Sequence, residues 1–185
     1  TQYPSSLSIF LGRGDGSFLL DNRYPVGDTP NFNPRFVAVA DLNLDGVQDL
    51  AVASETSAIS VFLGRGDGTF PPATQFAAGG KSYSLAVVDF NQDGFPDLAV
   101  ATAFEAYEGV LLVGHGDGQF DAPAPLGGGT GGCFIIAADF NHDGHPDLAV
   151  SDLFIARVSV VLGDGQGGIL RRVAISIGVV PQIAN

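Results

Sequence analysis

The sequence predicts an all-β fold built from tandem repeats of about 50 residues. Two different patterns share this period. An acidic segment of the form Asp-x-Asn-x-Asp-Gly-x-x-Asp begins at Asp41, Asp89 and Asp139. A short apolar run ends in a glycine at four places, which are Gly12, Gly64, Gly114 and Gly163. Because two independent patterns recur at one spacing, a repeated structural unit explains both.

Each repeat is predicted to contain four antiparallel strands. The first is a nearly continuous apolar run, as expected where both faces of a strand are covered, at 36–42, 84–90 and 134–140. The second follows the acidic segment, at 50–53, 98–102 and 148–151. The third ends at the glycine. A Gly-Asp-Gly turn, favourable for a hairpin because glycine accepts positive φ, leads to the fourth, at 17–25, 69–77, 119–126 and 169–176.

Four antiparallel strands repeated in tandem match the blade of a β-propeller. About three and a half blades are expected, as a partial propeller or a fragment: residues 1–34 form a half blade of outer strands, 35–83 and 84–133 are blades, and 134–185 hold a blade and the start of the connection to the next. A closed ring usually needs about four to eight blades. We therefore expect open strand edges that favour assembly.

The repeated segments resemble a known family. The acidic segment followed by Leu-Ala-Val, together with the Leu-Gly-x-Gly-Asp-Gly-x-Phe turn, is similar to the FG-GAP or VCBS repeat of integrin α-chain propellers and of secreted bacterial and fungal proteins. The resemblance covers nearly the whole chain. It implies that each acidic loop joins the first two strands of a blade and binds calcium on one face of the disc.

The acidic loops carry the ligands that calcium prefers, which are six to eight oxygen atoms. Positions 1, 3, 5 and 9 offer side-chain oxygens, position 7 offers a backbone carbonyl, and the glycine at position 6 permits a sharp turn. The sequence therefore predicts three Ca²⁺ sites. Their ligands are Asp41, Asn43, Asp45, Val47 and Asp49; Asp89, Asn91, Asp93, Phe95 and Asp97; and Asp139, Asn141, Asp143, His145 and Asp147.

Other interpretations of these loops fit the sequence less well than calcium sites do. An EF-hand would place glutamate at position 12, where Val52, Val100 and Val150 stand. Plain turns, in which carboxylates cap backbone amides, remain an alternative that three copies in identical register make less favourable. His142 and His145 flank Asp143 in a pattern that suggests zinc, but at positions 4 and 7 they are expected to be solvent-exposed.

The Arg-Gly-Asp tripeptides at 13–15 and 65–67 suggest adhesion, but they belong to the Gly-Asp-Gly turn of the repeat. The repeat alone accounts for their Gly-Asp. Adhesion through these tripeptides is therefore the less favoured interpretation.

Composition excludes several functional classes. Twenty acidic residues against eight basic ones give a net charge of −12, so nucleic acid is not an expected partner. Nine of the 17 aspartates lie in the three loops, and three calcium ions would halve the net charge. No apolar run reaches the roughly 18–20 residues that a transmembrane helix needs. We see no Ser-His-Asp or Cys-His arrangement, and we do not expect an enzyme.

We expect a calcium-stabilised module, extracellular or at the cell surface, that binds a glycan or a protein without catalysis. This location follows from the family resemblance and from the fit of such loops to calcium sites of about 10⁻⁴–10⁻³ M. Aromatic side chains beside polar groups suit such ligands, and they occur on the face opposite the calcium loops. The candidates are Phe32, Tyr83, Phe104, Tyr107 and Phe154.

Two other functions stay open. The chain is alternatively a structural subunit that forms an oligomer or filament through its open blade edges. It is alternatively an accessory domain of a larger secreted enzyme.

Overall fold

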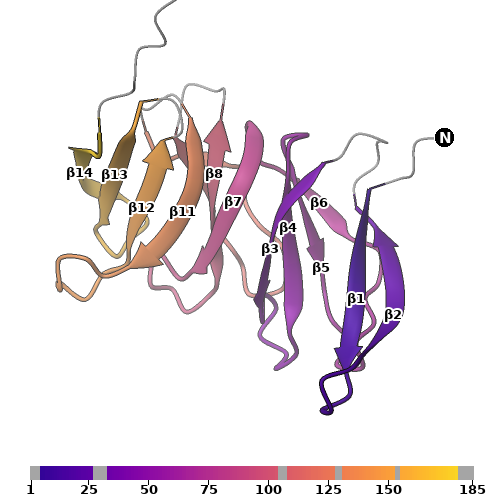
Figure 1. Cartoon of the computed structure of the whole chain (residues 1–185). Helices are drawn as coiled ribbons and strands as arrows, with labels where there is room; N and C mark the ends of the chain where they lie inside the picture. The colour runs from indigo at the N-terminus through magenta and orange to yellow at the C-terminus, as the bar shows by residue number, and fades with distance from the viewer. Residues whose placement is uncertain (1–4, 27–32, 104–107, 128–130, 153–154, 179–185) are drawn as a thin grey trace, which may run out of the picture.

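The computed structural model describes residues 5–26, 33–103, 108–127, 131–152 and 155–178. Within these residues all regular secondary structure is β-strand. The strands form one two-stranded sheet and three four-stranded sheets, which stand side by side in an array that is open at both ends (Figure 1). The predicted all-β class, with blades of four antiparallel strands, is confirmed. The described residues contain no helix of the length and apolarity that crossing a membrane requires.

Within each sheet, every strand pairs with the next one along the chain, and all pairs are antiparallel. The first sheet contains β1 (Ser6–Gly12) and β2 (Phe18–Pro25). The second contains β3 (Pro34–Ala40), β4 (Asp49–Ser54), β5 (Ala58–Phe62) and β6 (Thr74–Ala77). The third contains β7 (Lys81–Val88), β8 (Asp97–Ala103), β9 (Gly109–Leu112) and β10 (Ala124–Pro125). The fourth contains β11 (Gly132–Ala138), β12 (Asp147–Asp152), β13 (Arg157–Gly163) and β14 (Ile169–Ser176).

Some strand ends differ from those predicted. The first strands end two residues early, at Ala40, Val88 and Ala138, because the next residues already turn into the acidic loop. The outer strands of the two middle sheets are short. β6 begins at Thr74 instead of residue 69, and β10 spans only two residues. Pro71, Pro72 and Pro123 precede these strands, and proline cannot donate a ladder hydrogen bond.

The hydrophobic core lies between the sheets. One cluster fills the space between the second and third sheets and includes Ile59, Leu98 and Leu112. A second, between the third and fourth sheets, includes Leu111 and Val161. A third joins the first sheet to the second and contains Val26, Leu50 and Phe62. Every residue of β4 and β8 is buried, which explains why these strands are apolar at successive positions.

The third and fourth sheets are also joined by a buried carboxylate. Glu108 is 1% exposed, and its Oε1 accepts hydrogen bonds from the Arg157 guanidinium and from the Ser159 hydroxyl, the latter at 2.9 Å. Its Oε2 accepts one from Arg172 Nη1 at 2.8 Å. Arg172 also donates to the carbonyl oxygen of Leu126. Three residues of the fourth sheet thus surround one acidic side chain that immediately precedes β9 of the third sheet.

We expect Glu108→Ala to reduce the free energy of unfolding by about 2–3 kcal/mol. Breaking a fully buried ion pair costs about 3–5 kcal/mol, and here the arginines keep partial access to water. Urea unfolding measures the change. Glu55→Ala, which removes a carboxylate paired with the more exposed Arg35, is the matched control and should cost about 0–1 kcal/mol. Equal losses in the two variants would contradict a role for Glu108 in joining the sheets.

Candidate functional site

The three acidic loops, residues 41–49, 89–97 and 139–147, follow β3, β7 and β11 and lie along one edge of the array (Figure 1). We call this edge the acidic edge. The loops share one unusual backbone conformation. Position 4 is a non-glycine residue with positive φ, which is uncommon. The values are 58° at Leu44, 56° at Gln92 and 60° at His142, and the glycines at position 6 have 84°, 91° and 87°. The sequence pattern therefore specifies one loop shape.

In the first loop, the side chains at positions 1, 3 and 5 turn into the loop. Asp41 accepts hydrogen bonds from the N–H of Asp45 at 3.1 Å and of Gly46 at 2.8 Å. Asp45 accepts one from the N–H of Val47 at 2.8 Å and one from the Asn43 amide at 2.9 Å. Three oxygen-bearing side chains are thereby gathered around a single turn.

The other two loops repeat these contacts. Asp89 and Asp139 accept from the N–H groups at positions 5 and 6 at 3.0–3.2 Å. The asparagines at position 3 donate to the aspartates at position 5, at 2.8 Å in both loops. In the third loop the N–H of His145 and the amide of Asn141 lower the pKa of the Asp143 carboxyl. This carboxylate is thus held in the ionised form that a cation site needs.

The aspartate at position 9 has a different environment, which the sequence did not reveal. Asp49, Asp97 and Asp147 are fully buried. One oxygen of Asp49 accepts the N–H of Leu42 at 2.8 Å, and the other accepts the N–H of Gly64 at 2.7 Å. The same pair of bonds, at 2.8–3.0 Å, recurs at Asp97 and at Asp147. This side chain therefore joins the start of the acidic loop to the glycine that follows or ends the third strand.

Burial raises the pKa of the Asp97 carboxyl, against the opposing effect of the N–H groups of Gly114 and Phe90, which stabilise its charged form. A buried carboxylate of this kind is expensive unless both oxygens are hydrogen-bonded. The two N–H groups meet that requirement without a cation. Position 9 is consequently a structural residue of the blade, whether or not it also contacts an ion.

The donor chemistry of the loops fits calcium. Positions 1, 3 and 5 supply carboxylate and amide oxygens, which are hard ligands, and the carbonyl at position 7 is available. In the described part of the chain, no three His, Cys, Asp or Glu side chains form a group that could hold a metal ion. Position 3 is an asparagine and position 9 is turned to the backbone, so two carboxylates remain in each loop. The full predicted ligand set therefore stays a prediction.

The second and third acidic loops also contact each other. Gln92 donates to the carbonyl oxygen of Gly144 at 2.8 Å, and its Oε1 lies 2.7 Å from Nδ1 of His145. The expectation that His142 and His145 are exposed is confirmed for His142 and wrong for His145, which is half-buried by this contact. No sequence signal marks a pair 53 residues apart.

The Arg-Gly-Asp segments form turns. Asp15 accepts hydrogen bonds from the N–H and hydroxyl of Ser17, at 2.9 and 2.6 Å, and Asp67 accepts the same pair from Thr69. These bonds lower the pKa of both carboxyls. The aspartates thus cap the turn at the end of the hairpin, in agreement with the repeat interpretation.

Of the aromatic residues predicted to bind a ligand, Tyr83 is the one that the described residues include; Phe32, Phe104, Tyr107 and Phe154 lie outside them. Tyr83 is half-buried near the start of β7, away from the acidic edge. The Arg35 guanidinium lies 5.7 Å from the centre of its ring and is paired with Glu55. This pairing lowers the pKa of the Glu55 carboxyl, while burial raises that of the Tyr83 hydroxyl.

A groove on the acidic edge was not predicted. Its volume is about 510 Å³, and it lies between the first acidic loop and the Gly-Asp-Gly turn of the same sheet, with Val47, Arg65 and Phe70 among its lining residues. The sequence predicted residues that bind a glycan or a protein on the opposite edge only. The groove arises because the loop and the turn protrude side by side, a relation that follows from sheet register and not from local sequence.

Two family models match the chain. Residues 41–100 match the FG-GAP-like repeat, and residues 82–121 match the FG-GAP repeat. Residues 41–121 of the chain are thus similar to repeats of the FG-GAP type. Both matches include acidic loops with the geometry described above. No curated protein matches the chain.

Two solved structures align with the chain, and both are longer than it. An Agrocybe aegerita lectin, solved to explain its specific recognition of non-reducing terminal N-acetylglucosamine, aligns with a TM-score of 0.59 and 18% identity, over 94% of this chain and 47% of the lectin. BBS1N in complex with ARL6DN aligns with a TM-score of 0.48 and 15% identity, over 79% of this chain and 45% of that one. The chain spans about half the length of these structures. The lectin supports the fold, a partial β-propeller.

We expect Asp97→Asn to reduce the free energy of unfolding by about 1–3 kcal/mol, because asparagine accepts one of the two buried N–H groups and leaves the other unpaired. Urea unfolding in EGTA measures the loss without any contribution from calcium. Asp121→Asn, at an exposed aspartate outside the loops, is the control and should change little. If both variants unfold at the same urea concentration, the structural role given to position 9 is wrong.

Proposed function

We propose that this chain is part of an extracellular, calcium-stabilised β-propeller that binds a glycan or a protein without catalysing a reaction. The observation that carries the calcium part is the threefold repetition of one loop geometry along the acidic edge. Each loop gathers carboxylate and amide oxygens at positions 1, 3 and 5. Extracellular calcium is abundant enough for sites with a Kd of about 10⁻⁴–10⁻³ M.

We assign a role to five positions of each acidic loop. Positions 1, 3 and 5 would hold the ion through their side chains and position 7 through its carbonyl, while position 9 holds the loop against the third strand through its two N–H partners. Calcium would neutralise carboxylates that otherwise repel one another within a single turn. The ion is therefore proposed to stabilise the edge of the propeller, and ligand binding is assigned elsewhere.

Calcium is expected to raise the melting temperature. At 1 mM calcium and a Kd of about 0.1 mM, one site contributes about 1.4 kcal/mol of stability, or about 3–5 °C in a chain of this size. Calorimetry should give three sites per chain, and two in Asp93→Ala. Asp121→Ala serves as the control and should retain all three. A melting temperature that is equal in calcium and in EGTA would show that the loops are plain turns.

The binding part of the proposal rests on the fold that the chain shares with a lectin. We place the ligand on the edge opposite the acidic loops, beside Tyr83, where an aromatic ring and the Arg35–Glu55 pair lie together. Such a combination of aromatic and charged groups suits the polar surfaces of glycans and proteins.

A glycan array with calcium present is expected to identify at least one bound glycan. Tyr83→Ala should then weaken binding at least tenfold, because the aromatic face is lost. Arg65→Ala, in the groove of the acidic edge, is the matched control and should bind as the parent chain does. Loss of binding in Arg65→Ala alone would move the ligand to the acidic edge, and an array without any signal would argue against a lectin.

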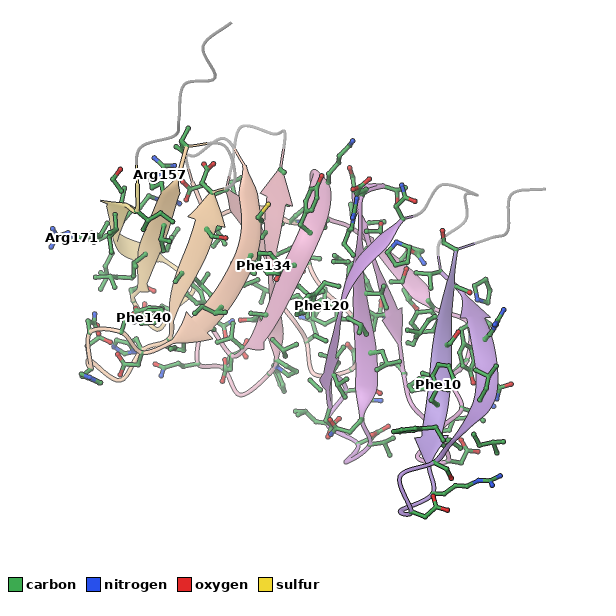
Figure 2. The ribbon with its side chains drawn as sticks, viewed as in Figure 1. Phe10, Phe120, Phe134, Phe140, Arg157 and Arg171 are labelled. Atoms are coloured by element: carbon green, nitrogen blue, oxygen red, sulfur yellow. The ribbon has the colours of Figure 1, made fainter. Side chains whose placement is uncertain are left out.

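Assembly is the second candidate function, and a specific observation favours it. Large apolar side chains are exposed on the two terminal sheets: Phe10 is 58% exposed and Phe18 69%, while Leu170 is 64% exposed. Phe10 lies at one end of the array and Arg171, next to Leu170, at the other (Figure 2). Patches of this kind mark contact surfaces. The role of an accessory domain in a secreted enzyme stays a prediction.

A further inference from the structure

The groove on the acidic edge owes its open space to a small side chain at position 7 of the first acidic loop. In the third sheet the ring of Phe95 lies so close to Gly116 that a Cβ on this glycine would overlap it. His145 lies against the turn of the fourth sheet in the same way. In the second sheet the residue is Val47, and a Cβ on Gly66 would stand 3.5 Å from its methyl group, which is an ordinary contact. The space that a larger side chain fills in the other two sheets is thus open here.

Two further differences from the repeat line the same groove. Position 8 is proline in the second and third loops, but in the first it is Gln48, which brings an exposed amide to the groove. The residue after the glycine that follows the third strand is Arg65 here, whereas the other two sheets have His115 and Asp164. His115 Nε2 lies 3.0 Å from a carboxylate oxygen of Asp121, and Asp164 accepts N–H groups of its own turn. Because the other copies form the same blade with different residues, the repeat does not require these three.

The lining of the groove carries a positive charge and no negative one. None of its nine residues is acidic, and Arg65 is the basic one. Two aspartates stand close by in the sequence, but both are engaged elsewhere. Asp49 is fully buried and accepts two N–H groups. Asp67 accepts the N–H and hydroxyl of Thr69, and these bonds, followed by the charge of Arg65, lower the pKa of its carboxyl.

This charge distribution favours a ligand with a carboxylate. The described residues include no ion pair between Arg65 and a carboxylate, so its guanidinium remains available for one. Arginine binds carboxylates through two parallel hydrogen bonds, which supply both strength and orientation. On the acidic edge of a chain with a net charge of −12, a lining of this kind is unexpected unless it serves such a ligand.

The remaining lining suits a peptide better than a sugar. Phe70 is half-buried and meets Tyr24 and Phe62 edge to face, with ring centres 5.6 and 6.4 Å apart. Its ring is thereby engaged with the core that joins the first two sheets. Four of the nine lining residues are glycines, which allow another backbone to approach closely. The volume of about 510 Å³ is also sufficient for a short peptide, since ligand pockets measure about 300–1,000 Å³.

We propose that the groove binds a short peptide segment of a partner protein through an aspartate or glutamate side chain. Arg65 donates two hydrogen bonds to the carboxylate, and the Gln48 amide donates one to a carbonyl of the peptide backbone. The glycines leave room for that backbone. This site is separate from the one placed beside Tyr83, and neither that site nor calcium enters the inference.

The probe is the tripeptide Gly-Glu-Gly with both ends capped, and Gly-Gln-Gly is its uncharged counterpart. Both are titrated in calcium into the ¹⁵N-labelled chain, and the backbone N–H signals are followed by NMR. We expect Gly-Glu-Gly to shift the signals of Val47, Gly66 and Thr69. Gly-Gln-Gly should bind about tenfold more weakly, because a hydrogen bond to a charged group is stronger than one between neutral groups.

Arg65→Ala should weaken the binding of Gly-Glu-Gly by about tenfold or more, because it removes the partner of the carboxylate. Arg13→Ala is the matched control and should bind as the parent chain does. Arg13 is exposed in the same Arg-Gly-Asp turn of the first sheet, but it does not line the groove. The pair of variants also separates the groove from adhesion through the tripeptide, which would involve both arginines.

Val47→Phe gives the first loop the residue that the second loop has at this position, so the variant should fold as the parent does. The ring should fill the groove and abolish binding of Gly-Glu-Gly. Position 7 is assigned to calcium through its backbone carbonyl alone, and calorimetry should therefore count as many calcium ions as in the parent. Tyr83→Ala, on the opposite edge, should leave binding of Gly-Glu-Gly unchanged.

Four results would overturn the inference: no shift of signals in the groove, equal binding of the two peptides, an equal loss in Arg13→Ala and Arg65→Ala, or undiminished binding in Val47→Phe. Glucuronate is the last probe. If it binds as tightly as Gly-Glu-Gly, the groove recognises a carboxylate without a peptide backbone, and the assignment to a peptide is wrong.

Discussion

The blades depend on a single buried side chain, the aspartate at position 9 of each acidic loop. Its two oxygens hold two N–H groups that are far apart in the sequence, one where the loop begins and one on the glycine after the third strand. A carboxylate without these bonds would be too costly to bury. The bonds in turn fix the register of three strands. The acidic loop, the Leu-Ala-Val strand and the glycine after the third strand are thereby held together.

The sequence was sufficient for the repeat, the strand order and the all-β class, because each depends on local chemistry that recurs at a fixed spacing. It was insufficient where the outcome depends on contacts between sheets. Asp49 carries the same carboxylate as Asp41, and only its burial shows that it serves the backbone. Glu108 has no repeated counterpart, and its three partners lie 49 to 64 residues away. The apolar pattern predicted longer outer strands than β6 and β10, because it did not account for the prolines that precede them.

The calcium hypothesis and the structural role of position 9 support each other. A loop that is already shaped by backbone hydrogen bonds brings its remaining oxygens together before an ion arrives, which lowers the entropy cost of binding. The positive φ at Leu44, Gln92 and His142 is part of this shape. Contact between Gln92 and His145 adds a link from one loop to the next. The second and third acidic loops are thus joined to each other.

Because the core lies between the sheets, the order in which the sheets unfold depends on their position in the array. Each sheet is stabilised by its immediate neighbours, so that the total stability approximates a sum of sheet and interface terms, as in a one-dimensional array. The third sheet has a cluster on each of its faces, whereas the first and fourth sheets have one each. We therefore expect local unfolding to begin at the first and fourth sheets and to proceed toward the middle of the array. The interface between two neighbouring sheets, more than a single blade, is then the unit that unfolds cooperatively.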